Sequence, residues 1–255
     1  LLMTEARNIK VLILTDGMPS GGTERQIVEL LKGLKLNSKE IKTVFGVLVK
    51  GGVREQEAVY WADEVLPIRQ SHKLDFTLAY SLIGLVRKYG IDIIHTFGSV
   101  SDIAGVCAAK VTSASLISGS IRNARRKLTK RDRLSRFAIR FADAVVANSR
   151  AGLIAFGVEH HQNAHIIYNG VEISRFENVL SQNYHFPYIC MVGNFTSKKD
   201  QQSLIMAFPE IAKAFPEYHL VFVGRGEKEQ NCKLLVENMG LSDKVSIGLN
   251  PVVNW

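Results

Sequence analysis

The glycines and lysines between residues 188 and 227 are the residues best suited to bind a phosphate. An apolar run, 189–192, is followed by a polar turn and a helical stripe, and a second apolar run, 220–223, is followed by a glycine turn. The turn residues of interest are Gly193, Asn194, Lys198, Lys199, Gly224 and Gly226. This pattern is typical of a βαβ unit with a glycine at the carboxyl end of each strand. Ligands of open parallel sheets bind outside those ends.

The turn Gly224-Arg225-Gly226 also resembles the start of a dinucleotide fingerprint. The third glycine of that fingerprint is absent, because Glu229 stands in its place, and the unit is not N-terminal. The sequence therefore disfavours a nicotinamide or flavin cofactor.

A second phosphate-sized turn, 16–22, follows the apolar run 10–15 and contains Gly21 and Gly22. Residues 23–26 have the form of a capping box, so a helix is expected to start at this turn. The free N–H groups of a helix N-terminus favour an anion. A tight strand–helix connection without ligand is the alternative.

Histidines give weaker signals. His95 follows a predicted strand, 91–96, and is either a site residue or a buried, hydrogen-bonded histidine. His160, His161 and His165 contain an i, i+4 pair that could suggest a metal, but only Glu159 accompanies them. A solvated loop is favoured for that segment, and no metal site is predicted.

The positive charge of the chain is concentrated in one segment. The net charge is +8, and residues 122–140 hold nine basic residues and one acid, which also gives +8. Leu134, Phe137, Ala138 and Phe141 form a helical stripe, and Arg133, Arg136 and Arg140 are expected on the opposite side. This helix is either a solvated face or a docking site for an anionic membrane surface. Nucleic acid is disfavoured because no aromatic stacking platform accompanies the charge.

The composition is that of a globular protein, with 46% hydrophobic and 22% charged residues in 255. No apolar run has the length of a membrane span, and nothing at the start resembles a signal peptide. The three cysteines, Cys107, Cys190 and Cys232, are expected to be buried free thiols in a reducing cytoplasm.

Predicted strands and helices alternate along the chain, which indicates parallel sheets with helices on both faces. The polar stretch 178–185 is predicted to be a linker. The expected domains are residues 1–180 and 184–255, both Rossmann-like. The second has 72 residues, which is short for a domain, so it is expected to be incomplete.

The chain resembles the family 4 nucleotide-sugar-dependent glycosyltransferases, which are retaining enzymes with two facing Rossmann-like domains (the GT-B fold). The resemblance rests on several motifs in a fixed order. They are residues 21–26 (GGTERQ), 92–95 (DIIH), 147–149 (ANS), 169–172 (NGVE), 193–208 (GNFTSKKDQQSLIMAF) and 223–226 (VGRG).

The resemblance implies that Lys199 and the glycine turns bind the diphosphate of a nucleotide-sugar donor. Asn194 stands where the family usually has an arginine, which removes one charge, and Lys198 is a candidate to compensate. Gly193, Gly21 and Gly22 would contact the same group, and Gly224 and Gly226 form the donor-side glycine turn. No metal or cofactor is implied.

On the acceptor side, the resemblance implies roles for residues after two strands of the first domain. Many members have a histidine after the strand that starts at Ser115, but residues 119–123 (GSIRN) contain none. The acceptor-side candidates are His95, Arg122 and Asn123.

The resemblance thus predicts a retaining transferase that moves a sugar from a nucleoside diphosphate to a saccharide or lipid-linked acceptor. Surface polysaccharide or glycolipid synthesis is the expected pathway, in the cytoplasm or at the inner face of the membrane. The family's glutamate pair would lie after Trp255, so this polypeptide is expected to be truncated and inactive alone. The alternatives are a non-catalytic binding or partner protein of the same origin and, less favoured, a sugar-nucleotide epimerase.

Overall fold

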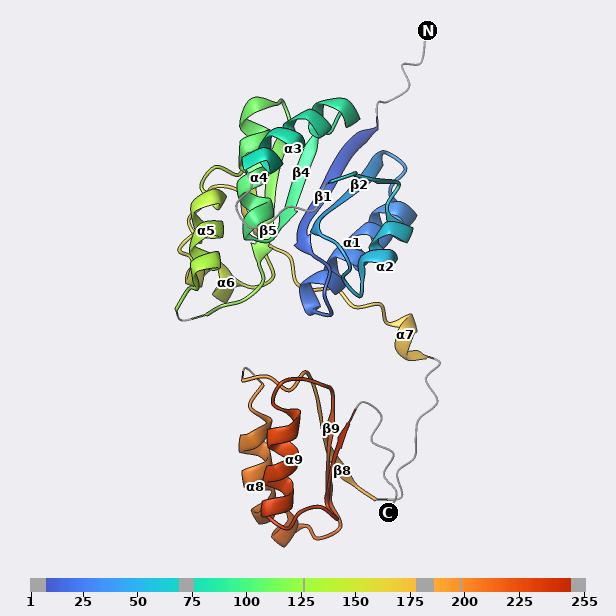
Figure 1. The fold of residues 1–255 in the computed structure, drawn as a ribbon, viewed down its shortest axis with the longest axis vertical. Coiled ribbons are helices and arrows are strands. Elements are labelled where there is room, and N and C mark those ends of the chain that lie inside the picture. Colours follow the sequence, from blue (N-terminus) through green and yellow to red (C-terminus); the bar gives the residue numbers. More distant parts are fainter. Residues whose placement is uncertain (1–7, 69–75, 126, 178–185, 198, 249–255) are drawn as a thin grey trace. The chain divides into compact units, whose positions relative to one another are not determined.

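The computed structural model describes residues 8–68, 76–125, 127–177, 186–197 and 199–248. The chain divides into two compact units, Leu1–Arg175 and Phe176–Trp255 (Figure 1). Each unit is built on its own parallel sheet. The predicted linker, residues 178–185, lies outside the described residues.

The first unit contains a seven-stranded sheet in the order β3-β2-β1-β4-β5-β6-β7, and all neighbouring strands are parallel. The strands are β1 (Ile9–Gly17), β2 (Ile41–Val49), β3 (Glu64–Val65), β4 (Ile93–Phe97), β5 (Ser115–Ile121), β6 (Ala144–Ala147) and β7 (Ala164–Ile166). The register places Ile13 beside Phe45 on one neighbour and beside His95 on the other. The sheet order turns at β1 and β4, which brings their carboxyl ends side by side.

Helices cover both faces of this sheet (Figure 1). On one face α1 (Gly22–Asn37) and α2 (Glu55–Trp61) bury Ile27, Leu31 and Ala58 against β1 and β2. On the other face four helices pack around Leu82, Ala108 and Phe156. They are α3 (Phe76–Tyr89), α4 (Ser99–Val111), α5 (Lys130–Ile139) and α6 (Arg150–Phe156). The short α7 (Ser174–Glu177) follows β7.

The second unit contains a three-stranded parallel sheet, ordered β10-β9-β8. Its elements are β8 (Tyr188–Val192), α8 (Gln201–Ala214), β9 (His219–Val223), α9 (Glu229–Asn238) and β10 (Val245–Gly248). Both helices lie on the same side of the strands (Figure 1), around Phe208 and Phe222. On β8 the alternate residues Tyr188, Cys190 and Val192 are exposed. Among the described residues of this unit, helices therefore cover one face and not two.

The α/β prediction with two Rossmann-like parallel-sheet units is confirmed. The sequence pattern missed α2 and α7, which are short. The prediction of three buried thiols is wrong for two of them, because Cys107 and Cys190 are exposed and only Cys232 is buried. No helix in the described part of the chain combines the length and apolar character needed to cross a membrane.

Candidate functional site

A cavity of about 480 Å³ opens in the first unit, where β1, β4 and β5 end. Thr15, Asp16 and Gly17 come from the end of β1, Phe97 and Gly98 from the end of β4, and Ser120 from β5. The starts of three helices complete the lining with Thr23 and Glu24 of α1, Ser99 and Val100 of α4, and Arg131 and Asp132 of α5. Arg122 and Asn123, which follow β5, also line it. Two of the three acceptor-side candidates therefore lie in one cavity.

The carboxylates around this cavity are held by helix N-termini. Asp16 accepts hydrogen bonds from the Ser101 N–H at 2.8 Å, the Ser101 hydroxyl at 2.7 Å and the Val100 N–H at 3.3 Å, at the first turn of α4. A Cβ on Gly98 would overlap the Asp16 carboxylate, so a side chain there would break this contact. Asp132 accepts from the N–H and hydroxyl of Thr129 in the capping box of α5. These carboxylates compensate helix dipoles rather than cations in the cavity.

Hydrogen bonds also set the ionisation of Asp132. Burial alone would raise its pKa, but the hydroxyl and N–H of Thr129, the charge of Arg125 and the amide of Asn123 outweigh burial and lower that pKa. Asp132 is therefore ionised at neutral pH.

Arg122 has a different environment. Its Nε donates to the Gly119 carbonyl at 2.7 Å, its Nη1 donates to Asn169 Oδ1 at 3.4 Å, and its guanidinium lies 5.0 Å from the centre of the Phe97 ring. No carboxylate in the described residues pairs with it. Burial lowers the pKa of Arg122 without any opposing acid, and the guanidinium remains charged.

His95 also lies against Phe97. Its ring centre is 4.5 Å from that of Phe97, and a Cβ on Gly119 would meet its Nε2 at 2.7 Å. Nε2 is buried and has no hydrogen-bond partner among the described residues. Burial, with a contribution from Arg122, lowers the pKa of His95 to about 3, so the imidazole is neutral. His95 supports Phe97 and does not line the cavity.

A buried carboxylate, Asp102 of α4, lies close to the cavity lining. Its Oδ1 accepts from the hydroxyls of Thr96 at 2.6 Å, Ser120 at 2.9 Å and Ser118 at 3.1 Å. Burial raises the pKa of Asp102 to about 6, although these hydroxyls oppose the rise. Ser120 also accepts from the Gly98 N–H at 2.7 Å. The group fixes the ends of β4 and β5 relative to α4.

The Gly21-Gly22 turn is the N-cap and first residue of α1. The predicted capping box at residues 23–26 is wrong, since the helix begins at Gly22 and no side chain caps it. Instead the Glu24 carboxylate folds back over Gly21, where a Cβ would collide with it. Thr23 and Glu24 line the cavity, but the two glycines do not.

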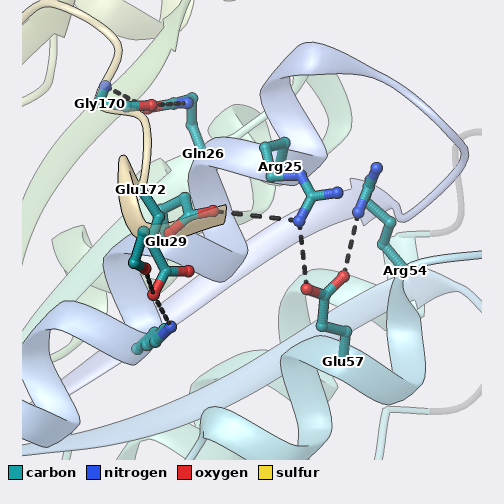
Figure 2. A network of polar contacts seen from close by, with 9 residues as sticks. Arg25, Gln26, Glu29, Arg54, Glu57, Gly170 and Glu172 are labelled. Carbon is teal, nitrogen blue, oxygen red and sulfur yellow. Dashed lines mark hydrogen bonds and ion pairs between the residues drawn. The ribbon is translucent and has the colours of Figure 1, made fainter. Parts of the chain in front are cut away.

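Polar contacts hold α1 against the segment that closes the first unit (Figure 2). The Gln26 amide donates to the Gly170 carbonyl and accepts from the Gly170 N–H, both at 2.8 Å. Lys32 bonds to Glu172 at 2.5 Å. On the other side of α1, Arg25 and Arg54 share Glu57 of α2, at 3.3 and 3.0 Å. These contacts fix α1, and with it the lining residues Thr23 and Glu24.

In the second unit, the predicted donor residues gather where β8 and β9 end. The side chain of Lys199 passes over Gly193, with its Cδ and Cε 3.7 Å from the position of a Cβ there. Asn194 and Lys199 are exposed, and Lys198 lies outside the described residues. The buried Gln201 amide donates to the Asn194 carbonyl at 3.1 Å, which fixes the turn.

Gly224 and Gly226 allow two loops of this unit to lie in close contact. A Cβ at Gly224 would overlap the Gly193 carbonyl, and one at Gly226 would overlap the backbone of Phe195. The Phe195 N–H donates to the Arg225 carbonyl at 2.9 Å, and the Lys228 N–H donates to the Phe195 carbonyl at 3.0 Å. The glycine turn therefore supports the loop that carries Asn194.

The family model described as "Glycosyltransferase Family 4" matches residues 20–175, more than half of the chain, and "Glycosyl transferases group 1" matches residues 173–250. The chain belongs to glycosyltransferase family 4. A search of curated proteins found no match.

Solved structures similar to this family 4 chain share its fold at low sequence identity. HepE of Anabaena, solved with UDP, is 19% identical with a TM-score of 0.74, over 94% of this chain and 69% of that one. The apo form of the lipopolysaccharide outer core galactosyltransferase WaaB is 17% identical with a TM-score of 0.68, over 94% and 68%. A protein of Listeria monocytogenes assigned as a UDP-N-acetylglucosamine 2-epimerase is 12% identical with a TM-score of 0.60, over 97% and 71%. The two-unit fold is thus that of GT-B glycosyltransferases.

The basic helix α5 of this family 4 chain differs from its prediction. The buried residues are Ser135, Ala138 and Ile139, whereas Phe137 and Phe141 are 55% and 43% exposed. The exposed stripe is Arg133, Arg136, Phe137, Arg140 and Phe141. The predicted apolar face is therefore wrong, because α5 packs closely on α4 through small side chains. Arginines and aromatic rings share the outer face.

The sequence analysis did not identify Asp16, Ser120 and Arg131 as lining residues. Asp16 stands at the end of a predicted strand, so the rule that ligands bind at strand ends would have found it. Ser120 and Arg131 come to line the same cavity only through the fold.

Proposed function

We propose that this protein is a retaining glycosyltransferase, which transfers a sugar from a nucleoside diphosphate to a saccharide or lipid-linked acceptor. The observation that carries the proposal is membership of glycosyltransferase family 4 along residues 20–175. Structural relatives support the donor class, since HepE was solved with UDP and with UDP-glucose. WaaB, a lipopolysaccharide galactosyltransferase, supports a role in surface polysaccharide or glycolipid synthesis.

In this proposal the second unit holds the donor diphosphate. Lys199 supplies a positive charge beside Gly193, and the start of α8 adds a helix N-terminus. Charge placed where the leaving diphosphate develops its own charge lowers the barrier to transfer. Asn194 can donate a hydrogen bond but has no charge. No metal or cofactor is required.

The donor site is tested by titrating the chain with UDP. Lys199→Ala should weaken UDP binding at least tenfold, because a charge-assisted hydrogen bond contributes about 1.5–3 kcal/mol. Lys213→Ala is the matched control, since Lys213 is also exposed and lies in the last turn of α8, the helix that begins after Lys199. Equal UDP affinity in the two variants would contradict the assignment. Glycosyl transfer itself is tested by sugar release from UDP-sugars with and without acceptors.

The first unit is proposed to dock on an anionic membrane surface through α5. Arg133, Arg136 and Arg140 alternate with the exposed Phe137 and Phe141, whose ring centres are 5.4 Å apart. Basic and aromatic side chains on one face suit the headgroup region of a bilayer. Such docking would fit an acceptor that is lipid-linked.

Vesicle flotation tests this surface. Binding to vesicles that contain anionic lipid should fall when Arg133, Arg136 and Arg140 are changed to Glu, and also after Phe137→Ser with Phe141→Ser. Arg150→Glu, an exposed arginine on α6 outside the stripe, should leave it unchanged. Unchanged binding in the triple and double variants would exclude the proposed docking.

A further inference from the structure

The charges around the cavity of the first unit are unbalanced. Of its carboxylates, Asp16 is bonded to the start of α4 and Asp132 to the start of α5, and Glu24 folds over Gly21 at the start of α1. Arg122 and Arg131 line the same cavity, and neither has a carboxylate partner among the described residues. The cavity therefore contains three carboxylates and two arginines, and no carboxylate of the described residues pairs with either arginine.

The surroundings of Arg122 show which of its donors remain free. The guanidinium has five N–H groups, of which one on Nε is used by Gly119 and one on Nη1 by Asn169. Phe97 supports one of its faces. The remaining N–H groups have no acceptor in the described residues. None of its nitrogens is buried without a partner, so the free N–H groups remain open to the cavity. A guanidinium that is held in place and keeps free donors suits an anionic ligand.

The groups next to Arg122 do not pair with its free N–H groups. His95 is neutral and lies against Phe97, with ring centres 4.5 Å apart. Ser120 is held by Asp102 and Gly98 at the cavity wall. Asn123 lines the cavity and donates to Asp132, and its buried amide oxygen, which has no partner in the described residues, can accept from a hydroxyl of the ligand. The cavity of about 480 Å³ can hold a sugar-sized group with its charge.

We propose that the first unit contains an anion subsite, in which Arg122, assisted by Arg131, binds a carboxylate or phosphate group of a substrate. Arg122 binds through the free edge of its guanidinium, which matches the two oxygens of either group. This deepens the proposed function and rests on it only for the carrier of the anion, which is the acceptor. An acidic sugar or a phosphorylated glycolipid would supply the anion on the acceptor.

The test measures binding of simple anions to the full chain by calorimetry. Inorganic phosphate and glucuronate are the probes, and glucose is the neutral match for glucuronate. Arg122→Gln should weaken both anions at least tenfold. Arg150→Gln, at an exposed arginine of α6 outside both the cavity lining and the basic stripe, should leave both affinities unchanged. Glucose should bind no better than background. Absence of saturable anion binding, equal affinity in the two variants, or equal binding of glucose and glucuronate would overturn the subsite.

Two further variants keep the test valid if Arg122→Gln does not fold. Arg122→Lys keeps the charge but loses the planar fork, and should weaken phosphate severalfold. Arg131→Gln lies at an exposed position and should also weaken it severalfold. If both bind phosphate as the wild type does, the subsite is refuted.

UDP distinguishes the source of the anion. If UDP binding depends on Lys199 and not on Arg122, the subsite serves the acceptor. If Arg122→Gln also weakens UDP, the assignment of the anion to the acceptor is wrong. If UDP does not bind at all while phosphate still requires Arg122, the donor assignment fails and the anion subsite remains.

Discussion

At the scale of single residues, some charged groups of the first unit have hydrogen-bond partners within the fold and others do not. Asp16 and Asp132 accept hydrogen bonds at the N-termini of α4 and α5, and Asp102 accepts from several hydroxyls. His95 is buried as a neutral base. Arg122 alone among these groups keeps donors for which the described residues provide no acceptor. The resemblance located Arg122 and Asn123, but the state of His95 required the burial seen in the structure.

His95 makes the protein sensitive to acid. Its pKa in the folded protein, about 3, lies below the ordinary value of 6.5. Between these two pH values the imidazole is protonated in the unfolded chain and neutral in the folded one. Stability is therefore lost as pH falls from 6.5 towards 3. Between pH 7.5 and 5.0 the wild type should lose about 2 kcal/mol relative to His95→Gln, as measured by urea unfolding.

The pKa of Asp102 is shifted in the opposite direction to that of His95, so the wild type must be compared with His95→Gln at each pH. Its pKa is raised to about 6, so the folded chain gains stability as pH falls from 6 to 3.8. Asp102 is present in both proteins and cancels in the difference. The exposed His160→Gln provides the control. A difference between wild type and His95→Gln that does not change with pH would show that His95 is not buried as described.

Asn194 offers a gain-of-binding test in the second unit. The side chain is exposed beside Gly193, at the position where members of glycosyltransferase family 4 usually have an arginine. Asn194→Arg should strengthen UDP binding severalfold, since it restores a charge near the proposed diphosphate. Asn194→Lys adds a positive charge without the planar guanidinium group. Weaker UDP binding in both variants would mean that this turn does not face the diphosphate.

At the scale of elements, α5 shows how far periodicity can be trusted. Two sets of residues in this segment have helical spacing: Leu134, Phe137, Ala138 and Phe141, and Ser135, Ala138, Ile139 and Ala142. The larger side chains favoured the first set, but the second is buried. Small side chains allow α5 to lie close to α4, and this preference depends on a neighbour that the local pattern does not contain.

The corrected face of α5 predicts unequal costs for two truncations. Ile139→Ala should lower the free energy of unfolding by about 2–4 kcal/mol, because it leaves a cavity in the core. Phe137→Ala should change it by less than about 0.5 kcal/mol, since the ring is exposed. Urea unfolding of both variants checks this. The reverse order of costs would restore the face predicted from the sequence.

At the scale of the whole molecule, the sequence predicted two parallel-sheet units because strand and helix patterns alternate along the chain. It could not predict the cavity, whose lining residues come from strand ends and helix starts as distant as Asp16 and Asp132. Asp16 accepts hydrogen bonds from the first turn of α4, a helix that begins more than 80 residues later. Such contacts depend on strand order, which local patterns do not encode.

The two units have separate cores, so a destabilising substitution in one unit should not destabilise the other. The clusters around Leu82 and Leu31 contain residues of the first unit, and the cluster around Phe208 contains residues of the second. In Gly226→Ala, the added methyl group would overlap the backbone of Phe195, which cannot move aside as a side chain could. The substitution should destabilise the second unit by about 2–3 kcal/mol.

Hydrogen exchange resolves the effect by element. In Gly226→Ala, exchange should accelerate in β8 and β9, while β1, β4 and β5 keep their protection, because amides open with the cooperative unit that contains them. Gly84→Ala is the matched control, since Gly84 lies inside α3 with nothing within 4 Å of an added Cβ. That substitution should stabilise the first unit by about 0.5–1 kcal/mol. Faster exchange in both sheets of Gly226→Ala would mean that the units unfold together.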